Sequence, residues 1–439
     1  MPKLAFILGL FFLEHGLIPA SAQAKSTVIV EPQISNPLVL VGQPAKIFLK
    51  IGLTGILPEQ EFRAPVNLAI VLDRSGSMSG RKLAQAKEAA ILAVNRLTPE
   101  DTISIVVYGS TVDVIVTPRH VTNKRAIINA ISSIRSYGKT ALFAGVSVGA
   151  EQLRRYLDRN RVNRIILLSD GLANVGPSSP FELASLGSSL TKEGISVTTM
   201  GLGLGYNEDL MSRLAMAADG NHVFIENSND LPRIFTLELG DVLSVVAQDV
   251  YIELKLPDYV RPLRLLGRDG LINGQNISAH LNQVIASQEK YLLLELEVKA
   301  PNVAQQKPVA EILYNYRELN GSQQSGHTTV MIEGCESPKK VENSLNKSVV
   351  AAAVELIANE QNKLALTLRD QGNIAEAHRV LKQNESYLNQ QSTKLKSKRL
   401  KELEKQNAEQ SNNLDEHNWG RSRKIMRDMQ VKSSTQRSY

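Results

Sequence analysis

The spacing of hydrophobic residues changes several times along the chain, and each change indicates a different kind of structure. Before residue 66 the apolar residues come in short β-branched runs, Thr27–Pro32, Leu38–Leu40 and Lys46–Ile51, separated by Asn, Pro and Gly. Such runs predict short strands. From Val66 onward, continuous apolar runs alternate with amphipathic stretches, which predicts a different architecture.

Residues 66–244 alternate between buried strands and helices. Val66–Leu72 is a continuous apolar run, typical of a strand covered on both faces, and Gly80–Leu97 has apolar residues at helical spacing. The pattern then predicts strands at Ile103–Tyr108, Val112–Val116, Arg164–Leu168, Ser196–Met200 and His222–Ile225, and helices at Asn123–Ile134, Ala144–Leu157, Pro180–Glu193, after the cap Asn207, and at Asp230–Leu243. This alternation predicts an α/β fold, a doubly wound and mostly parallel sheet with helices on both faces.

Helical spacing stops at about Val245, and residues 245–335 are β-rich. Strands are expected at Asp249–Leu256, Arg261–Leu266, Lys290–Val298, Ala310–Tyr316 and His327–Ile332. Neither these strands nor those of residues 25–65 look sufficient for a stable sandwich alone. We therefore expect residues 25–65 to pair with residues 245–335 in a β-sandwich-like domain, with the α/β domain inserted between them.

Residues 341–432 are expected to form an α-helical C-terminal region. An apolar stripe ends at Gln371-Gly372-Asn373 and a second one begins at Ile374, which predicts a helical hairpin. Beyond Thr393, Lys, Glu and Gln dominate, which favours a basic polar helix or a solvated segment. The composition of residues 433–439 predicts a disordered end.

The net charge of +6 comes entirely from this C-terminal region. Twelve of the 50 Lys and Arg and six of the 44 Asp and Glu lie between Lys394 and Arg437, so the remaining 38 of each sign balance. The balance argues against a nucleic-acid-binding body, which needs a basic face of its own. A solvated basic tail is the favoured interpretation, and weak contact with an anionic surface such as lipid headgroups is the alternative.

Residues 1–24 resemble a signal peptide. Lys3 precedes the apolar run Leu4–Leu13, which is too short to span a bilayer, and small residues surround the expected cleavage after Ala24. An ordinary buried N-terminal segment is the alternative. No later segment of the sequence has the ~18 apolar residues of a membrane span. We therefore expect an exported protein, periplasmic or extracellular, and the single cysteine, Cys335, cannot form an intrachain disulfide.

Polar residues follow the first buried strand of the α/β domain. In Asp73-Arg74-Ser75-Gly76-Ser77, one carboxylate and two hydroxyls at a spacing of two point the same way along an extended turn. Ligands bind at this edge of an open parallel sheet. Two neighbouring loops at the same edge supply Thr140 and Asp170. Such oxygen ligands suit a hard divalent cation, Mg²⁺ in the first place, which prefers six ligands and keeps exchangeable waters.

The order Asp73-x-Ser75-x-Ser77, Thr140, Asp170 resembles the metal-ion-dependent adhesion site of von Willebrand factor A domains and integrin inserted domains. The region 66–244 is similar to the group found in bacterial exported proteins, often labelled calcium-activated chloride channel-like or inter-alpha-trypsin inhibitor heavy chain-like. The resemblance implies that Mg²⁺ or Mn²⁺ binds there, with Ca²⁺ as a further possibility, and that a protein partner's Asp or Glu completes the shell. It also assigns the loop of Gly201, Gly203 and Gly205 to the rim of the site.

These observations favour a non-enzymatic, metal-dependent adhesion or interaction protein of the cell envelope. The alternative is a scaffold subunit of an envelope assembly complex that uses the C-terminal helices, with the metal site as a regulatory element. No nucleophile, base and orienting acid fall together in the sequence, so no catalytic residues are assigned, and neither are organic cofactor-binding residues.

Overall fold

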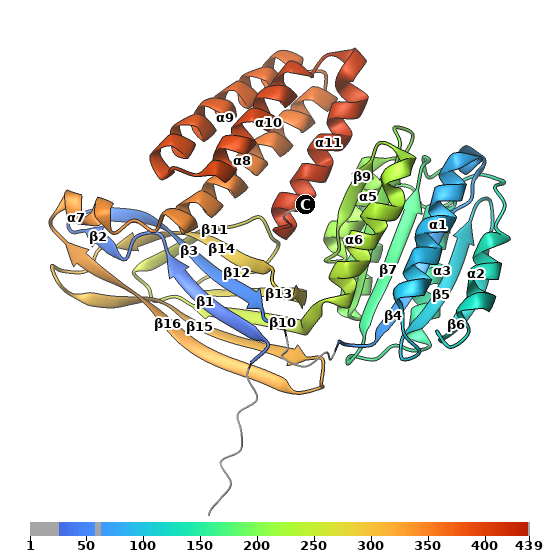
Figure 1. Cartoon of the computed structure of the whole chain (residues 1–439). Coiled ribbons are helices and arrows are strands. Elements are labelled where there is room, and N and C mark those ends of the chain that lie inside the picture. The colour runs from blue at the N-terminus through green and yellow to red at the C-terminus, as the bar shows by residue number, and fades with distance from the viewer. Residues whose placement is uncertain (1–25, 58–62, 438–439) are drawn as a thin grey trace, which may run out of the picture.

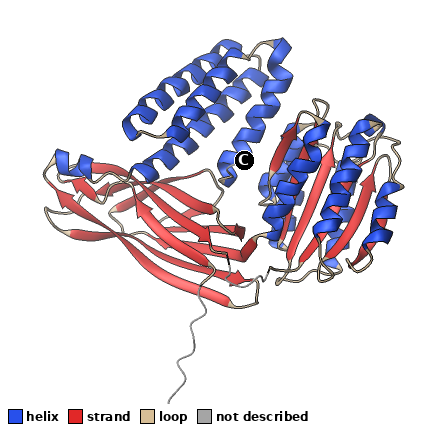
Figure 2. Cartoon of the chain, viewed as in Figure 1, coloured by secondary structure: helices blue, strands red, loops and turns tan. Residues whose placement is uncertain are grey.

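The structure, a computed structural model, describes residues 26–57 and 63–437 and consists of three parts: an α/β domain, a β-sandwich and a helical bundle (Figures 1 and 2). The signal peptide predicted for residues 1–24 lies outside the described residues. Across the described ranges, no helix has both the length and the hydrophobicity needed to cross a bilayer.

The α/β domain contains a six-stranded sheet in the order β6-β5-β4-β7-β8-β9, and all neighbouring pairs are parallel except β5 and β6. Its strands are β4 (Val66–Asp73), β5 (Thr102–Tyr108), β6 (Val112–His120), β7 (Val162–Ser169), β8 (Ile195–Leu202) and β9 (His222–Ile225). Its helices are η1 (Gly76–Met78), α1 (Arg81–Arg96), α2 (Lys124–Ser132), α3 (Leu142–Arg154), α4 (Pro180–Lys192), α5 (Glu208–Ala217), η2 (Ser228–Asp230) and α6 (Leu231–Leu243). The predicted fold class is confirmed.

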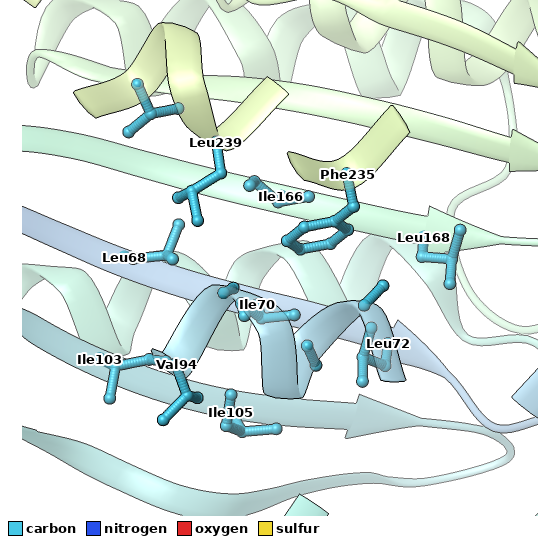
Figure 3. Close-up of a cluster of buried hydrophobic side chains, with 14 of the residues drawn as sticks. Leu68, Ile70, Leu72, Val94, Ile103, Ile105, Ile166, Leu168, Phe235 and Leu239 are labelled. Atoms are coloured by element: carbon cyan, nitrogen blue, oxygen red, sulfur yellow. The ribbon is translucent and has the colours of Figure 1, made fainter. Parts of the chain in front are cut away.

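Both faces of this sheet are covered, which explains the uninterrupted apolar run of β4. Leu68, Ile70 and Leu72 lie in one core with side chains of α1, α2 and α6, including Phe235 (Figure 3). The intervening residues of β4, such as Val71, lie in a second core with α3, α4 and α5. A strand that buries side chains on both faces has no polar alternation.

The β-sandwich has a four-stranded sheet in the order β1-β3-β14-β11 and a six-stranded sheet in the order β12-β13-β10-β15-β16-β2. Its strands are β1 (Val28–Ile34), β2 (Leu38–Leu40), β3 (Pro44–Gly55), β10 (Val245–Lys255), β11 (Val260–Leu266), β12 (Leu271–Asn273), β13 (Asn276–Ile285), β14 (Glu289–Lys299), β15 (Gln306–Glu318) and β16 (Gln323–Cys335). β3 lies between β1 and β14, and β2 pairs with β16. Each sheet therefore contains strands from both sides of the α/β domain.

The strand β13 is absent from the sequence prediction because polar residues interrupt its apolar pattern. Two of them, Asn282 and Gln283, are buried against the α/β domain. The side-chain amide of Asn282 donates a hydrogen bond to Ser196 Oγ at 3.3 Å, and Gln283 Oε1 accepts a hydrogen bond from the buried guanidinium of Arg164. These polar side chains connect the two domains, so they do not mark a loop.

The helical bundle comprises α7 (Pro338–Asn343), α8 (Lys347–Asp370), α9 (Ile374–Leu395), α10 (Lys398–Asn412) and α11 (Glu416–Thr435). α8 and α9 form the expected hairpin, whose turn contains Gly372 at φ +84°. Ala353 and Leu356 of α8 pack against Leu266 and Leu293 of the four-stranded sheet. The basic segment beyond Thr393 forms two helices, α10 and α11, where one was expected.

Residues 433–437 are ordered and mostly buried, so the prediction of a disordered end at 433–439 is wrong for them. The prediction of a solvated basic tail agrees with the exposed residues Lys394, Lys396, Lys398, Lys401 and Lys405, but it is wrong for the C-terminal part of α11. α11 extends to Thr435, and Arg437 is 8% exposed. Arg437 pairs with Glu238, at 3.3 Å, and with Asp241 of α6. Residues 438 and 439 lie outside the described residues. The acidic partners are distant in the sequence, so the composition of the tail did not indicate them.

A network of ion pairs fastens α11 to the α/β domain beside β9 (Figure 1). The guanidinium of Arg423 contacts Glu208 and, at 2.5 Å, Asp209 of α5, and it also contacts Asp370 of α8, within the bundle, at 2.7 Å. Lys424 pairs with Glu208 and Arg427 with Asp209. The side chain of Arg423 is only 18% exposed, so these pairs are shielded from solvent more than ordinary surface pairs.

We predict that Arg423→Met loosens α11. Three carboxylates lose a partner, and the cost is on the order of 2 kcal/mol for a partly buried network. Amide hydrogen exchange of residues 416–435 should become roughly thirtyfold faster, because the exchange rate depends on the free energy of local opening, which falls by that amount. Arg261→Met, which removes an exposed pair with Glu297, is the matched control and should leave exchange unchanged. Unaltered exchange in Arg423→Met would contradict the assignment.

His222 in β9 is fully buried beneath α11. Its Nδ1 lies 2.9 Å from Thr199 Oγ1, and its Nε2 lies 3.3 Å from Tyr206 Oη. Burial, together with Lys424, Lys432 and Arg427 of α11, lowers the pKa of His222 to about 3. The imidazole is therefore neutral in the folded protein across the physiological pH range.

This pKa predicts an acid-sensitive fold. Below about pH 6.5 the unfolded chain binds a proton at His222 that the folded protein does not, so stability falls as pH falls toward 3. From about pH 7.5 to about pH 5.5 this single group should remove on the order of 1 kcal/mol from the free energy of unfolding. Urea unfolding at the two pH values should show a smaller loss for His222→Gln than for the wild type. Equal losses would mean that His222 does not titrate as described.

Candidate metal centre

Asp73 is the last residue of β4, a central strand, so it lies at the middle of the carboxyl edge of the sheet, where the parallel strands end. Its side chain is fully buried. Oδ1 accepts a hydrogen bond from the Ser75 amide at 2.8 Å, and Oδ2 accepts one from Ser169 Oγ at 2.8 Å. Burial raises the pKa of Asp73 above its ordinary value, and the neighbouring charge of Asp170 adds to this rise, although the hydrogen bonds oppose it.

The two serines of the motif connect Asp73 to Asp170. Ser75 Oγ and Ser77 Oγ lie 3.0 Å apart, and Ser77 Oγ donates to Asp170 Oδ1 at 2.7 Å. Ser75 and Asp170 are buried, whereas Ser77 is exposed. The polar cluster is therefore buried at the end of the sheet and is accessible to solvent on the side of Ser77.

Thr140 completes the cluster from the loop before α3. A Cβ atom added at Gly171 would lie 3.2 Å from Thr140 Oγ1 and 3.4 Å from Ser77 Oγ, so both hydroxyls adjoin the loop of Asp170. The Thr140 amide donates to Asn174 Oδ1 at 2.9 Å, which ties this loop to the one after β7. The structure thus places all five residues predicted from the sequence around one point.

Three further residues of the site were not predicted from the sequence. Ser169 holds Asp73, Asn174 holds Thr140, and Lys82 Nζ lies 2.5 Å from Asp170 Oδ2. Lys82 lies in the first turn of α1, close to the motif, but nothing in its spacing indicates that its side chain turns back. Its ammonium is the positive charge that faces Asp170 in the structure.

Arg74, the residue between the first two ligand positions, positions the loop of Thr140. Its buried guanidinium contacts Asp113 and Tyr137 Oη and lies 4.2 Å from the centre of the Tyr137 ring. The Tyr137 amide donates to the Arg74 carbonyl at 2.7 Å. These contacts fix two of the three loops relative to each other.

The glycine loop after β8 borders the site, as the family resemblance implies for Gly201, Gly203 and Gly205. A Cβ at Gly205 would lie 2.8 Å from the Asp170 carbonyl oxygen, and one at Gly203 would lie 3.9 Å from Lys82 Nζ. Because a side chain at Gly205 would displace the backbone of Asp170, glycine is required for this close approach.

The donor set fits a hard divalent cation. It consists of two buried carboxylates and three hydroxyls, all oxygen, which is the chemistry that Mg²⁺, Mn²⁺ and Ca²⁺ prefer. The ammonium of Lys82 at Asp170 shows that the site attracts positive charge. No group of three or more His, Cys, Asp or Glu side chains within residues 26–57 and 63–437 could hold a metal ion, so this hydroxyl-rich site is of a different kind from a carboxylate or histidine cluster.

Residues 67–237 match the family model of the von Willebrand factor type A domain. The inserted α/β unit is a von Willebrand factor type A domain. The matched segment runs from β4 into α6 and contains all five residues of the cluster. Domains of this family commonly take part in protein interaction and adhesion and commonly bind a divalent metal ion at this position.

Known proteins resemble this chain over different lengths. A protein of Synechocystis sp. is 28% identical over 258 residues, which cover 56% of this chain and 61% of that protein. A human inter-alpha-trypsin inhibitor heavy chain is 27% identical over 180 residues, or 38% of this chain and 20% of the heavy chain. The predicted likeness to that group is confirmed, but the chain spans less than two thirds of the length of either relative.

A solved structure shares the wider architecture. The von Willebrand factor type A protein of Catenulispora acidiphila superposes with a TM-score of 0.68 at 16% identity and covers 85% of this chain and 89% of that chain. At this identity the likeness concerns the fold alone. It extends well beyond the von Willebrand factor type A domain, which occupies less than half of the chain.

Proposed function

We propose that this protein is a non-enzymatic, divalent-metal-dependent binding protein of the cell envelope, whose metal edge captures an acidic residue of a protein partner. The observation that supports the proposal is the convergence of Asp73, Ser75, Ser77, Thr140 and Asp170 at the carboxyl edge of the sheet. The carboxylate of Asp73 is buried beside the like charge of Asp170, which is costly, so a bound metal ion would stabilise this arrangement.

These five residues would hold Mg²⁺, and Mn²⁺ or Ca²⁺ are alternatives with the same ligand preference. The bound ion would supply a hard positive centre for an incoming carboxylate. One side of the site is accessible to solvent. Ser77 and Gly76 are exposed there, so a partner can approach from that side. Ser169 and Asn174 keep Asp73 and Thr140 in position while it does so.

The expected export signal supports a location in the periplasm or outside the cell. The C-terminal helices, which the alternative hypothesis assigns to an assembly complex, are largely engaged within the molecule. α8 packs on the sandwich and α11 on the von Willebrand factor type A domain. This internal use favours the metal edge over the helices as the binding surface.

Titration calorimetry of residues 25–439 with Mg²⁺ and Mn²⁺ tests the proposal. The wild type should bind a single ion, and Asp73→Asn and Asp170→Asn should each weaken binding by about a hundredfold or more, because each removes a charged ligand. Asp258→Asn, an exposed carboxylate of the sandwich, is the control and should bind as the wild type does. Circular dichroism establishes that the variants are folded. Binding that survives both substitutions would refute the site, as would its absence from the wild type for Mg²⁺, Mn²⁺ and Ca²⁺ alike.

Lys82 should weaken metal binding, because its ammonium is paired with one carboxylate oxygen of Asp170 and repels the metal ion. We predict that Lys82→Met tightens Mg²⁺ binding by roughly five- to tenfold, the size of a Coulomb term between partly solvated charges a few ångströms apart. Lys87→Met, in the same helix but bonded to the Ser132 carbonyl, is the matched control and should change little. Weaker binding in Lys82→Met would instead show that Lys82 orients Asp170 for the metal.

A further inference from the structure

Large apolar side chains stand exposed beside the metal edge. Leu172 is 58% exposed, Leu204 is 56% exposed and Phe181 is 81% exposed. Single exposed apolar residues are common on protein surfaces. Here, however, all three belong to segments that follow β7 and β8 at the carboxyl edge, the same edge at which Asp73 and Asp170 lie.

Their positions relative to the site follow from the chain. Leu172 is two residues beyond Asp170. Leu204 lies between Gly203, which adjoins Lys82, and Gly205, which adjoins the Asp170 carbonyl. Phe181 is in the first turn of α4, where the segment that leaves β7 ends. The apolar side chains therefore flank the metal site on the side of β7 and β8.

The loops directly at the site are also basic, and the acidic residues that border them are engaged with other groups. Asp113 pairs with Arg74, Glu182 accepts a hydrogen bond from Ser179, and Glu208 and Asp209 pair with Arg423. Residues 74–82, 109–111, 135–141, 171–180 and 203–207 contain no Asp or Glu. They contain five basic residues, Arg74, Arg81, Lys82, Arg135 and Lys139. Arg74 and Lys82 are paired inside the site, whereas Arg81 and Lys139 are exposed.

The basic surface has a boundary on the far side of the sheet. The segment after β9 carries Glu226 and Asp230, and Glu226 is paired with Arg421 of α11. An acidic partner would therefore be attracted to the edge between Lys139 and Leu204 and not to the edge beyond β9. Complementary charge of this kind selects partners and accelerates their association.

We propose that this rim is a binding surface for an extended, net acidic segment of a protein partner. The segment carries large apolar side chains next to the carboxylate that the metal takes. Leu172, Leu204 and Phe181 bury those apolar side chains, and Arg81 and Lys139 attract the acidic flanks. This inference rests on the proposed function for the metal-bound carboxylate and adds the chemistry of the residues around it.

Selection from a displayed library of nine-residue peptides tests the inference. Each peptide has a fixed central Asp and random flanks, and selection on residues 25–439 is performed with Mg²⁺ and in parallel with a chelator. The magnesium-dependent pool should be enriched in Leu, Ile or Phe close to the central Asp and in further acidic residues, and depleted of Lys and Arg. The selected peptides should bind the double variant Leu172→Ser, Leu204→Ser at least tenfold more weakly, as expected when apolar contacts at the centre of an interface are removed.

The matched control is Leu271→Ser, which alters a leucine of β12 that is 63% exposed and belongs to the sandwich. Calorimetry shows whether each variant still binds Mg²⁺. Absence of metal binding in the wild type would refute the proposed function. If the metal binds, peptides without flanking preference or peptides indifferent to the leucine variant would each overturn this inference alone. No enrichment above the chelator sample would contradict the capture of a carboxylate and therefore the proposed function as well. A magnesium-dependent dimer lost in the leucine variant would place a second copy on the rim and overturn it as well.

Discussion

The orientation of the von Willebrand factor type A domain is set by its insertion into the sandwich. Both connections, from β3 into β4 and from α6 into β10, leave the domain at the edge where the parallel strands begin. At that edge the guanidinium of Arg164 is buried against Gln283, and burial lowers the pKa of this arginine to about 10. The opposite edge, with Asp73, therefore faces away from the sandwich. A doubly attached domain cannot turn its ligand edge inward without breaking these contacts.

The C-terminal helices add a second constraint. α8 is packed on one sheet of the sandwich, while α11 is joined by ion pairs to α5 and, through Arg437, to α6. The chain thereby forms a closed path from sandwich to bundle to von Willebrand factor type A domain. Interfaces rich in ion pairs are more polar than a domain core and more sensitive to salt. The position of the metal edge relative to the sandwich thus depends on electrostatic contacts as well as on the covalent connections.

Local patterns in the sequence were sufficient for the fold class and for the five residues of the candidate site. The apolar run of β4 and the motif that follows it are contiguous, and parallel strands bring the other two loops to the same edge. The sequence was uninformative where the partner of a residue lies far along the chain. Asn282 and Gln283 interrupt the apolar pattern of β13 because they contact another domain, and basic residues of α11 pair with acidic residues some 200 positions away in the sequence. Lys82 was not predicted because the spacing of residues along the sequence does not indicate that its side chain is directed toward Asp170.

The carboxylate of Asp428 accepts a hydrogen bond from the Phe224 amide at 3.1 Å, so α11 covers the outer edge of β9. An uncovered edge strand can recruit strands of other chains. During synthesis the residues of α11 emerge long after β9, and N-terminal domains generally fold first. Until α11 has been made, the nascent chain presents that edge, and at the earlier stage before β14 has been made it also presents an incomplete sandwich, because β3 pairs with β14. The interval before α11 has been made is therefore the time at which the edge of β9 is most exposed to aggregation, and a shielding chaperone would act then.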